Sequence, residues 1–120
     1  MFPFESTAML WIQWNCPAER PLRPIRATTH WAVLERLAKF GATPLSERVV
    51  VDGKIITAAG VSAGIDMALG LAARLAGETV AQSIQLGIEY DPQPPFAGSP
   101  SKVPAALVDA ARRVLTRAGG

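Results

Sequence analysis

The side chains of this 120-residue chain that could do chemistry begin with its single histidine and its single cysteine. His30 follows Thr28 and Thr29 at the end of an expected short strand, and side chains at such ends commonly reach a cleft outside the sheet. Imidazole can move a proton or hydrogen-bond a thiolate near neutral pH. Two interpretations stay open: a proton-handling residue, or a buried histidine that ties the strand end to a carbonyl.

Cys16 is the candidate nucleophile, and its neighbours argue against that role. A nucleophile on a sharp strand-to-helix turn needs small neighbours, and the N–H of the next residue helps to form the oxyanion hole. Trp14 and Asn15 precede Cys16, and Pro17 has no N–H to give. We therefore expect an ordinary, unreactive thiol.

A glycine-containing loop, Gly60-Val61-Ser62 with Gly64 close behind, follows an expected strand and opens a helix. Glycines allow close backbone approach, and a helix N-terminus offers free N–H groups. Ser62 is the expected N-cap. Asp66 lies near the helix start, where a capping carboxylate is favoured over an acid or base.

Two further acidic residues, Glu89 and Asp91, flank Tyr90. Neighbouring residues on a helix point apart, so the two carboxylates are not expected to share a proton. They are expected to end the helix. One histidine and one cysteine fall short of a metal-ligand set, so we predict no metal site.

The elements that must position these side chains begin near residue 26. Apolar positions in 31–40 predict a short amphipathic helix that ends at Gly41. The β-rich runs 48–51 and 54–58, separated by Asp52-Gly53, predict a tight hairpin.

Helices follow the hairpin. The run 63–75 is apolar around most of its circumference, so it should be buried in the centre of the domain. After Gly77, a second helix is predicted over 78–89 and ends at Asp91-Pro92. The prolines that follow make a stiff extended loop, and 103–118 reads as a terminal helix.

Chain length sets the domain organisation. A chain of 120 residues suits one domain. Residues 1–25 contain four prolines and no coherent period, so they are expected to be irregular, and 26–120 to form the domain. Short strands alternating with helices indicate an α/β class, with too few strands for an independent parallel sheet.

Composition and charge indicate which partners and which cellular location to expect. The net charge is +2 and the arginines fall in two loose groups, so no nucleic-acid partner is expected. The N-terminal segment lacks a basic start and a bilayer-length apolar run, so no signal peptide or membrane contact is predicted. One cysteine excludes an intrachain disulfide, and a cytoplasmic location is expected.

Three stretches carry a resemblance to a known family: RATTHW from Arg26, TAAGVSAGID from Thr57 and IEYDPQPPF from Ile88. Together they resemble the C-terminal half of a ThiJ/PfpI domain, within the class I glutamine amidotransferase-like superfamily. The isonitrile hydratase-like branch is the most similar. The resemblance covers about residues 26–101.

The resemblance implies a fold and an activity. The fold would be the C-terminal half of a flavodoxin-like doubly wound α/β sandwich with an incomplete central sheet, without cofactor or metal and commonly dimeric. The activity would be that of a lyase that hydrates an isonitrile to an N-substituted formamide through a cysteine nucleophile. His30 would lie near that cysteine, and Thr28, Thr29 and the loop Gly60, Val61 and Ser62 would form the pocket wall.

Three hypotheses remain. The chain is a truncated, catalytically impaired isonitrile hydratase-like protein. Alternatively, it is an active enzyme that uses Cys16 or is completed by another chain. The third is a ligand-sensing domain related to AraC-type transcription regulators. An open strand edge also predicts a homo-oligomer, and an active protein would take a small-molecule substrate.

Overall fold

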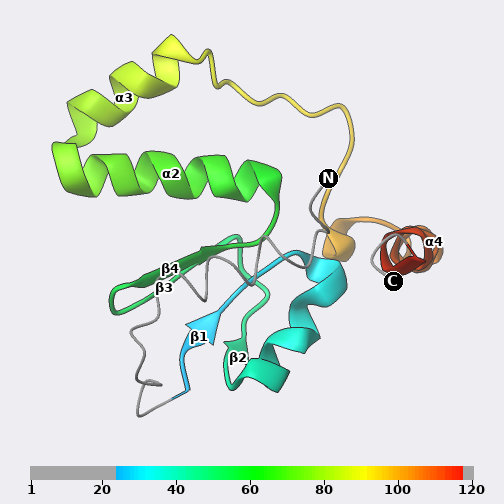
Figure 1. The fold of residues 1–120 in the computed structure, drawn as a ribbon. Coiled ribbons are helices and arrows are strands. Elements are labelled where there is room, and N and C mark those ends of the chain that lie inside the picture. Colours follow the sequence, from blue (N-terminus) through cyan, green and yellow to red (C-terminus); the bar gives the residue numbers. More distant parts are fainter. Residues whose placement is uncertain (1–23, 118–120) are drawn as a thin grey trace.

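The computed structural model describes residues 24–117, and in this part short strands lie between helical layers (Figure 1). In chain order the elements are β1 (Arg26–Ala27), η1 (Trp31–Phe40), β2 (Thr43–Pro44), β3 (Val49–Asp52), β4 (Ile55–Ala58), α2 (Val61–Ala76), α3 (Glu78–Gly87), η2 (Pro100–Lys102) and α4 (Ala105–Arg117). The strands of this part form two small sheets, β1–β2 and β3–β4, so the predicted mixture of helices and few strands is observed.

The β3–β4 hairpin confirms the strongest local prediction. The strands are antiparallel, and Asp52 pairs with Ile55. Asp52 is therefore the last strand residue, and the connection is Gly53-Lys54, one position later than predicted. Gly53 has φ of 64°, a left-handed conformation that glycine adopts without steric cost.

Strand β1 is held between β2 and the hairpin. It pairs with β2 in parallel, through bonds that the N–H groups of Thr43 and Leu45 donate, at 2.7 and 2.8 Å. Pro44 lies between these two donors, where its missing N–H breaks no bond of this pair. The proline explains why sequence pattern alone did not identify β2 as a strand.

Two side chains fix the direction of β1 against the hairpin. The Arg26 N–H donates to Asp52 Oδ2 at 2.8 Å, and the Thr28 N–H donates to Thr57 Oγ1 at 2.9 Å. Asp52 ends β3 and Thr57 is near the end of β4, so β1 runs in the same direction as β4. The carboxyl ends of β1 and β4 consequently lie at the same end of the molecule.

The core lies between β1 and η1. The buried apolar residues of this cluster are Ile25, Ala27, Leu37 and Ala42, with Leu34 and Ile55 packed against them. The predicted helix over 31–40 is confirmed in its bounds, with 3₁₀ geometry, and Gly41 caps it in the left-handed region with φ of 81°. The Gly41 N–H donates to the Ala38 carbonyl, which satisfies a helix-end acceptor.

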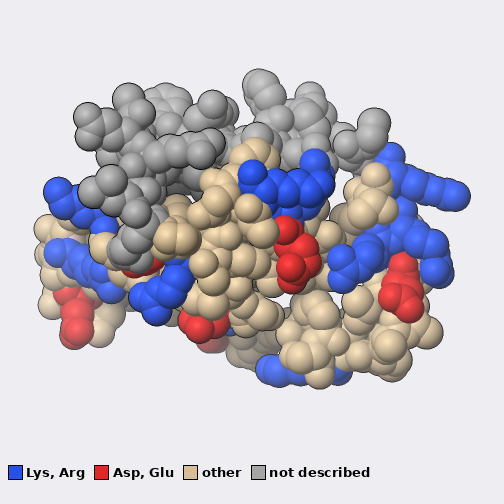
Figure 2. Space-filling model, turned by 90° about the horizontal axis from the view of Figure 1, so that it is seen from below, with Lys and Arg blue, Asp and Glu red and all other residues tan. Residues whose placement is uncertain are grey.

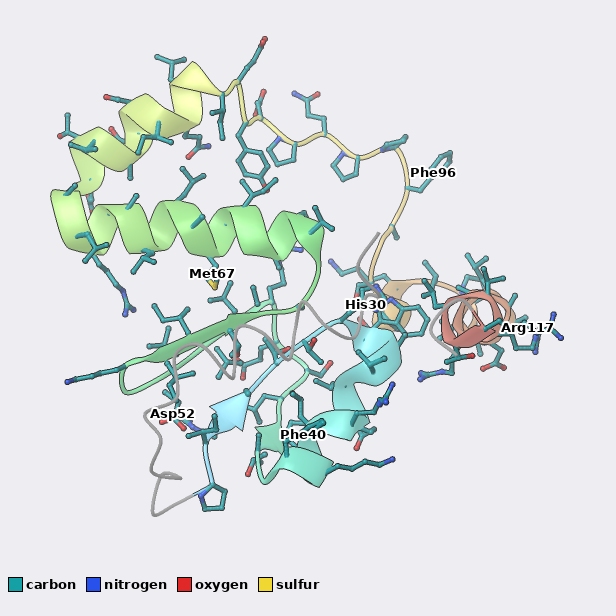
Figure 3. All side chains as sticks on the ribbon, in the orientation of Figure 1. His30, Phe40, Asp52, Met67, Phe96 and Arg117 are labelled. Carbon is teal, nitrogen blue, oxygen red and sulfur yellow. The ribbon has the colours of Figure 1, made fainter. Side chains whose placement is uncertain are left out.

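Helix α2 corrects the prediction of a buried central helix. It packs between α3 and the hairpin, and Met67 points toward the hairpin (Figures 1 and 3). Among its described residues only Ala63 is buried, while Leu75 is 79% exposed. An apolar circumference is buried only where other elements cover it, and within residues 24–117 the elements in substantial contact with α2 are α3 and the hairpin.

The C-terminal elements return the chain to η1. Gly77, with φ of 92°, separates α2 from α3 as predicted, and the segment after α3 runs to η2 without helix or strand (Figure 1). The predicted terminal helix is confirmed as α4, whereas η2 was not predicted. Arg112 joins α4 to η1: its guanidinium lies 5.1 Å from the Trp31 ring centroid and donates to the Ala32 carbonyl at 3.3 Å.

Candidate functional site

Several sequence-predicted site residues follow strands that end at the same end of the molecule: Thr28, Thr29 and His30 come after β1, and Gly60–Ser62 comes after β4. Thr28 and Thr29 are buried just after β1, and Thr28 Oγ1 donates to the Glu47 carbonyl at 2.8 Å. With the bond from Thr28 to Thr57, the N–H and the hydroxyl of Thr28 both fasten the end of β1 to neighbouring segments. Thr28 therefore supports this end of the sheet, and its buried hydroxyl is already hydrogen-bonded.

His30 caps η1. Its Nδ1 accepts a hydrogen bond from the Ala32 N–H at 3.3 Å, and its ring lies 5.5 Å from the Trp31 ring, tilted by 34°. A neutral imidazole that accepts at Nδ1 carries its proton on Nε2. Partial burial lowers the pKa of His30 from its usual 6.5, because desolvation disfavours the charged form. The lowered pKa favours the neutral ring, whose proton would then lie on Nε2.

We expect the single histidine to titrate below its usual 6.5. Because the folded state then resists protonation, the unfolded chain binds more protons below pH 6.5, and the free energy of unfolding should fall as the pH drops through this window. Histidine ring signals in an NMR titration, followed by denaturant unfolding at several pH values, would check this. A His30→Asn variant should lose this acid sensitivity, and a His30 pKa at or above 6.5 would contradict it.

The loop Gly60-Val61-Ser62 forms the start of α2. Gly60, in extended backbone, is the N-cap and has no side-chain cap bond, so the prediction that Ser62 caps the helix was wrong. The helix begins at Val61, whose side chain is 78% exposed. Asp66 lies beyond the first turn, so its predicted role as a capping carboxylate is also corrected.

Asp66 instead joins three segments of the chain. Its Oδ2 accepts a hydrogen bond from Arg48 Nη2, and its Oδ1 accepts one from the Tyr90 hydroxyl at 2.7 Å. The bond from Arg48 and then that from Tyr90 lower the pKa of Asp66, against a smaller opposing effect of burial. The same bond to Asp66 is the main reason that the pKa of Tyr90 rises above its usual 10.0. Both shifts follow from the same arrangement, in which an ionised Asp66 accepts a hydrogen bond from a protonated Tyr90.

An open groove of about 500 Å³ lies over this cluster. Its lining combines polar side chains with two prolines: Arg48, Ser62, Asp66, Tyr90, Pro92, Gln93 and Pro94. Ser62, the last residue of the predicted pocket-wall loop, borders the groove, and its Oγ lies 3.4 Å from Arg48 Nη2.

The remaining candidate residues from the sequence are Cys16, Glu89 and Asp91. Cys16 is outside the described residues. Glu89 and Asp91 are not a helical pair: Glu89 has φ of 52°, and Asp91 accepts from Gln93 Nε2 at 3.2 Å. Sequence reasoning missed Arg48 and Thr57 because each acts through a contact distant in sequence. For Arg48, the sequence offered one signal, a charged side chain immediately before the apolar strand β3.

The described part offers no gathering of metal ligands or membrane span. Across residues 24–117, no three His, Cys, Asp or Glu side chains come together in a way that could hold a metal ion. No helix in that same range combines the length and apolar character needed to cross a bilayer. On the face shown in Figure 2, basic side chains lie in several separate places with acidic side chains between them.

Comparison with known proteins agrees with this geometry. The DJ-1/PfpI family pattern matches residues 18–74. The chain is 53% identical over 89 residues to an isonitrile hydratase of Pseudomonas putida, a match that spans 73% of this chain and 39% of the relative. A crystal structure of a ThiJ/PfpI family protein from Pseudomonas syringae superimposes with a TM-score of 0.73 at 44% identity, over 80% of this chain and 40% of that one.

These comparisons define the class first: an α/β chain with part of a flavodoxin-like fold. Over the part that matches, the chain belongs to the DJ-1/PfpI (ThiJ/PfpI) family. It spans about two fifths of the length of the relatives it matches. The predicted resemblance is therefore confirmed.

Proposed function

We propose that residues 24–117 provide the histidine-bearing wall of a pocket that hydrates an isonitrile to an N-substituted formamide. The observation that carries the proposal is the shared end of β1 and β4, which brings His30 and the loop Gly60–Ser62 to one edge. The 53% identity to an isonitrile hydratase supports this substrate class.

The reaction adds one water across the isonitrile carbon and nitrogen. A cysteine thiolate attacks the isonitrile carbon, which then takes a proton to give a thioimidate. The nitrogen is protonated as water adds to the same carbon, which gives R–NH–CH(OH)–S–enzyme. The thiolate then leaves as the hydroxyl gives its proton to a base, and R–NH–CHO forms. His30 suits this sequence because a neutral ring with Nε2–H can hydrogen-bond the thiolate or pass a proton near pH 7.

The chain on its own is expected to be catalytically impaired. Cys16 is its single cysteine, and Pro17 cannot supply the N–H that an oxyanion hole after the nucleophile requires. The nucleophile is therefore proposed to come from another polypeptide segment that completes the pocket. A cytoplasmic, oligomeric protein acting on a small molecule is part of the same proposal.

A chimera tests the proposal directly. Residues 24–117 would replace the matching part of the Pseudomonas putida relative, and formamide formation from an alkyl isonitrile would be measured. We expect turnover by the chimera and none by the isolated chain. A folded chimera without turnover would overturn the proposed function.

Cys16 is tested separately in the isolated chain. Wild type and Cys16→Ser should give the same absence of formamide. Turnover by the wild-type chain that disappears in Cys16→Ser would show that Cys16 is the nucleophile after all.

A further inference from the structure

The cluster around Asp66 lies outside the residues that the proposed reaction uses, and three separated segments meet there. Arg48 comes immediately before β3, Asp66 belongs to the second turn of α2, and Tyr90 follows α3. We call these three residues the latch, and the segment Pro92–Pro94 that lines the same groove the strap.

The latch also reaches the N-terminal turn of α2. Arg48 Nη2 lies 3.4 Å from Ser62 Oγ, and the Tyr90 hydroxyl lies 3.4 Å from the Ser62 carbonyl oxygen. Both distances are long for hydrogen bonds, so the stronger bonds are those to Asp66. The two oxygens of Asp66 thus hold the Arg48 guanidinium and the Tyr90 hydroxyl, and each of these groups also lies close to Ser62.

A strained turn aims Tyr90 at this carboxylate. Glu89 has φ of 52°, the sole positive φ of a non-glycine residue in the described range. Such backbone persists only where surrounding contacts fix it. Here Tyr90 is tied to α3 by its N–H, which donates to the Gln85 carbonyl at 3.0 Å, and by its carbonyl, which accepts from Gln85 Nε2 at 3.1 Å.

We propose that Arg48 and Tyr90 are positioning residues that act through Asp66 to fix the Gly60–Ser62 loop and to hold the strap beside it. The role in shaping a substrate pocket rests on the proposed function, whereas the mechanical coupling of the three segments does not. Removing one member of the latch should loosen both the loop and the strap, although they are far apart in sequence.

Hydrogen exchange of the full chain at pH 7, resolved by peptide, tests the coupling. In Tyr90→Phe, peptides covering 59–65 and 88–96 should exchange about three- to tenfold faster, because an opening now breaks one hydrogen bond fewer. Peptides from the η1–β2 region should not change. Faster exchange in 88–96 alone would overturn the proposal, since the strap would then move without the loop.

A second variant, Arg48→Met, tests the other contact of Asp66. Its matched control is Arg113→Met, at an exposed position of α4. Arg48→Met should speed exchange in 59–65, whereas Arg113→Met should leave both segments unchanged. Arg48→Lys, which keeps a positive charge opposite Asp66, should restore part of the protection. Equal exchange in Arg48→Met and wild type would overturn the role of Arg48.

The single tyrosine gives a spectroscopic readout that a merely structural change would not mimic. Absorbance at a phenolate wavelength reports Tyr90 alone, within the pH range where circular dichroism stays constant. Asp66→Asn should lower the pH at which Tyr90 ionises, because the phenol loses its charged acceptor. Identical titration of wild type and Asp66→Asn would overturn the latch. None of these measurements needs turnover, so the latch and the proposed function can fail separately.

Discussion

Replacing His30 by asparagine in the chimera is expected to lower kcat/KM about 100-fold or more, the usual scale for losing a positioned proton-transfer group. His30 caps η1, and its proposed catalytic role would use the other nitrogen of the ring. Its Nδ1 accepts the Ala32 N–H, and an asparagine side-chain oxygen can accept that N–H and is a favoured N-cap. Asparagine lacks the Nε2 donor. Steady-state kinetics with an alkyl isonitrile at pH 7 would measure the loss.

The control for this variant is stability. His30→Asn should change the free energy of unfolding by less than about 1 kcal/mol, because the cap bond is kept. Lys39→Gln, a change at an exposed position in the last turn of η1, should alter neither stability nor turnover. If His30→Asn keeps full turnover, the histidine only caps η1 and the proposed proton-handling role is wrong.

Much of the local structure follows from local signals. Asp52-Gly53 between two β-rich runs predicted the hairpin, and Gly41 after an amphipathic run predicted the end of η1. Both signals work because glycine alone adopts a left-handed backbone without a steric penalty. A short strand before His30 was also expected and is present as β1. The expectation that His30 and the loop Gly60–Ser62 form one pocket wall came from the family resemblance, and it stays a prediction.

The rest depends on contacts between distant residues. Pro44 obscured β2, since a proline weakens a strand prediction, yet its neighbours donate the two bonds to β1. Asp66 was assigned to its own helix end because sequence shows only neighbours. Its partners, Arg48 and Tyr90, lie 18 and 24 residues away, and no local pattern connects them.

The exposure of α2 has a similar cause. Its composition predicts burial, but burial is a property of what surrounds a helix. The relatives are longer than this chain, which spans two fifths of their length. A composition suited to a fully covered helix is therefore consistent with the family, while the described residues cover only part of it.

Replacing Leu37 by alanine is expected to lower the free energy of unfolding by about 2–5 kcal/mol, the range for truncating a buried leucine. Leu37 is 4% exposed and packs in the cluster with Ile25, Ala27 and Ala42. Two of its three neighbours in this cluster are alanines, which cannot extend into the space that the lost side chain leaves. Denaturant unfolding at one fixed protein concentration would measure the change.

Leu86→Ala in α3 is the matched control, since the same chemical change there affects a side chain that is 82% exposed. It should cost less than about 1 kcal/mol, because little apolar area returns to water. Equal losses in the two variants would contradict a core centred between β1 and η1. Because η1 begins at the His30 cap, Leu37→Ala should also loosen the backbone that orients the imidazole, and the His30 ring signals should broaden or shift. Stability of this small core and the placement of His30 are therefore coupled through one helix.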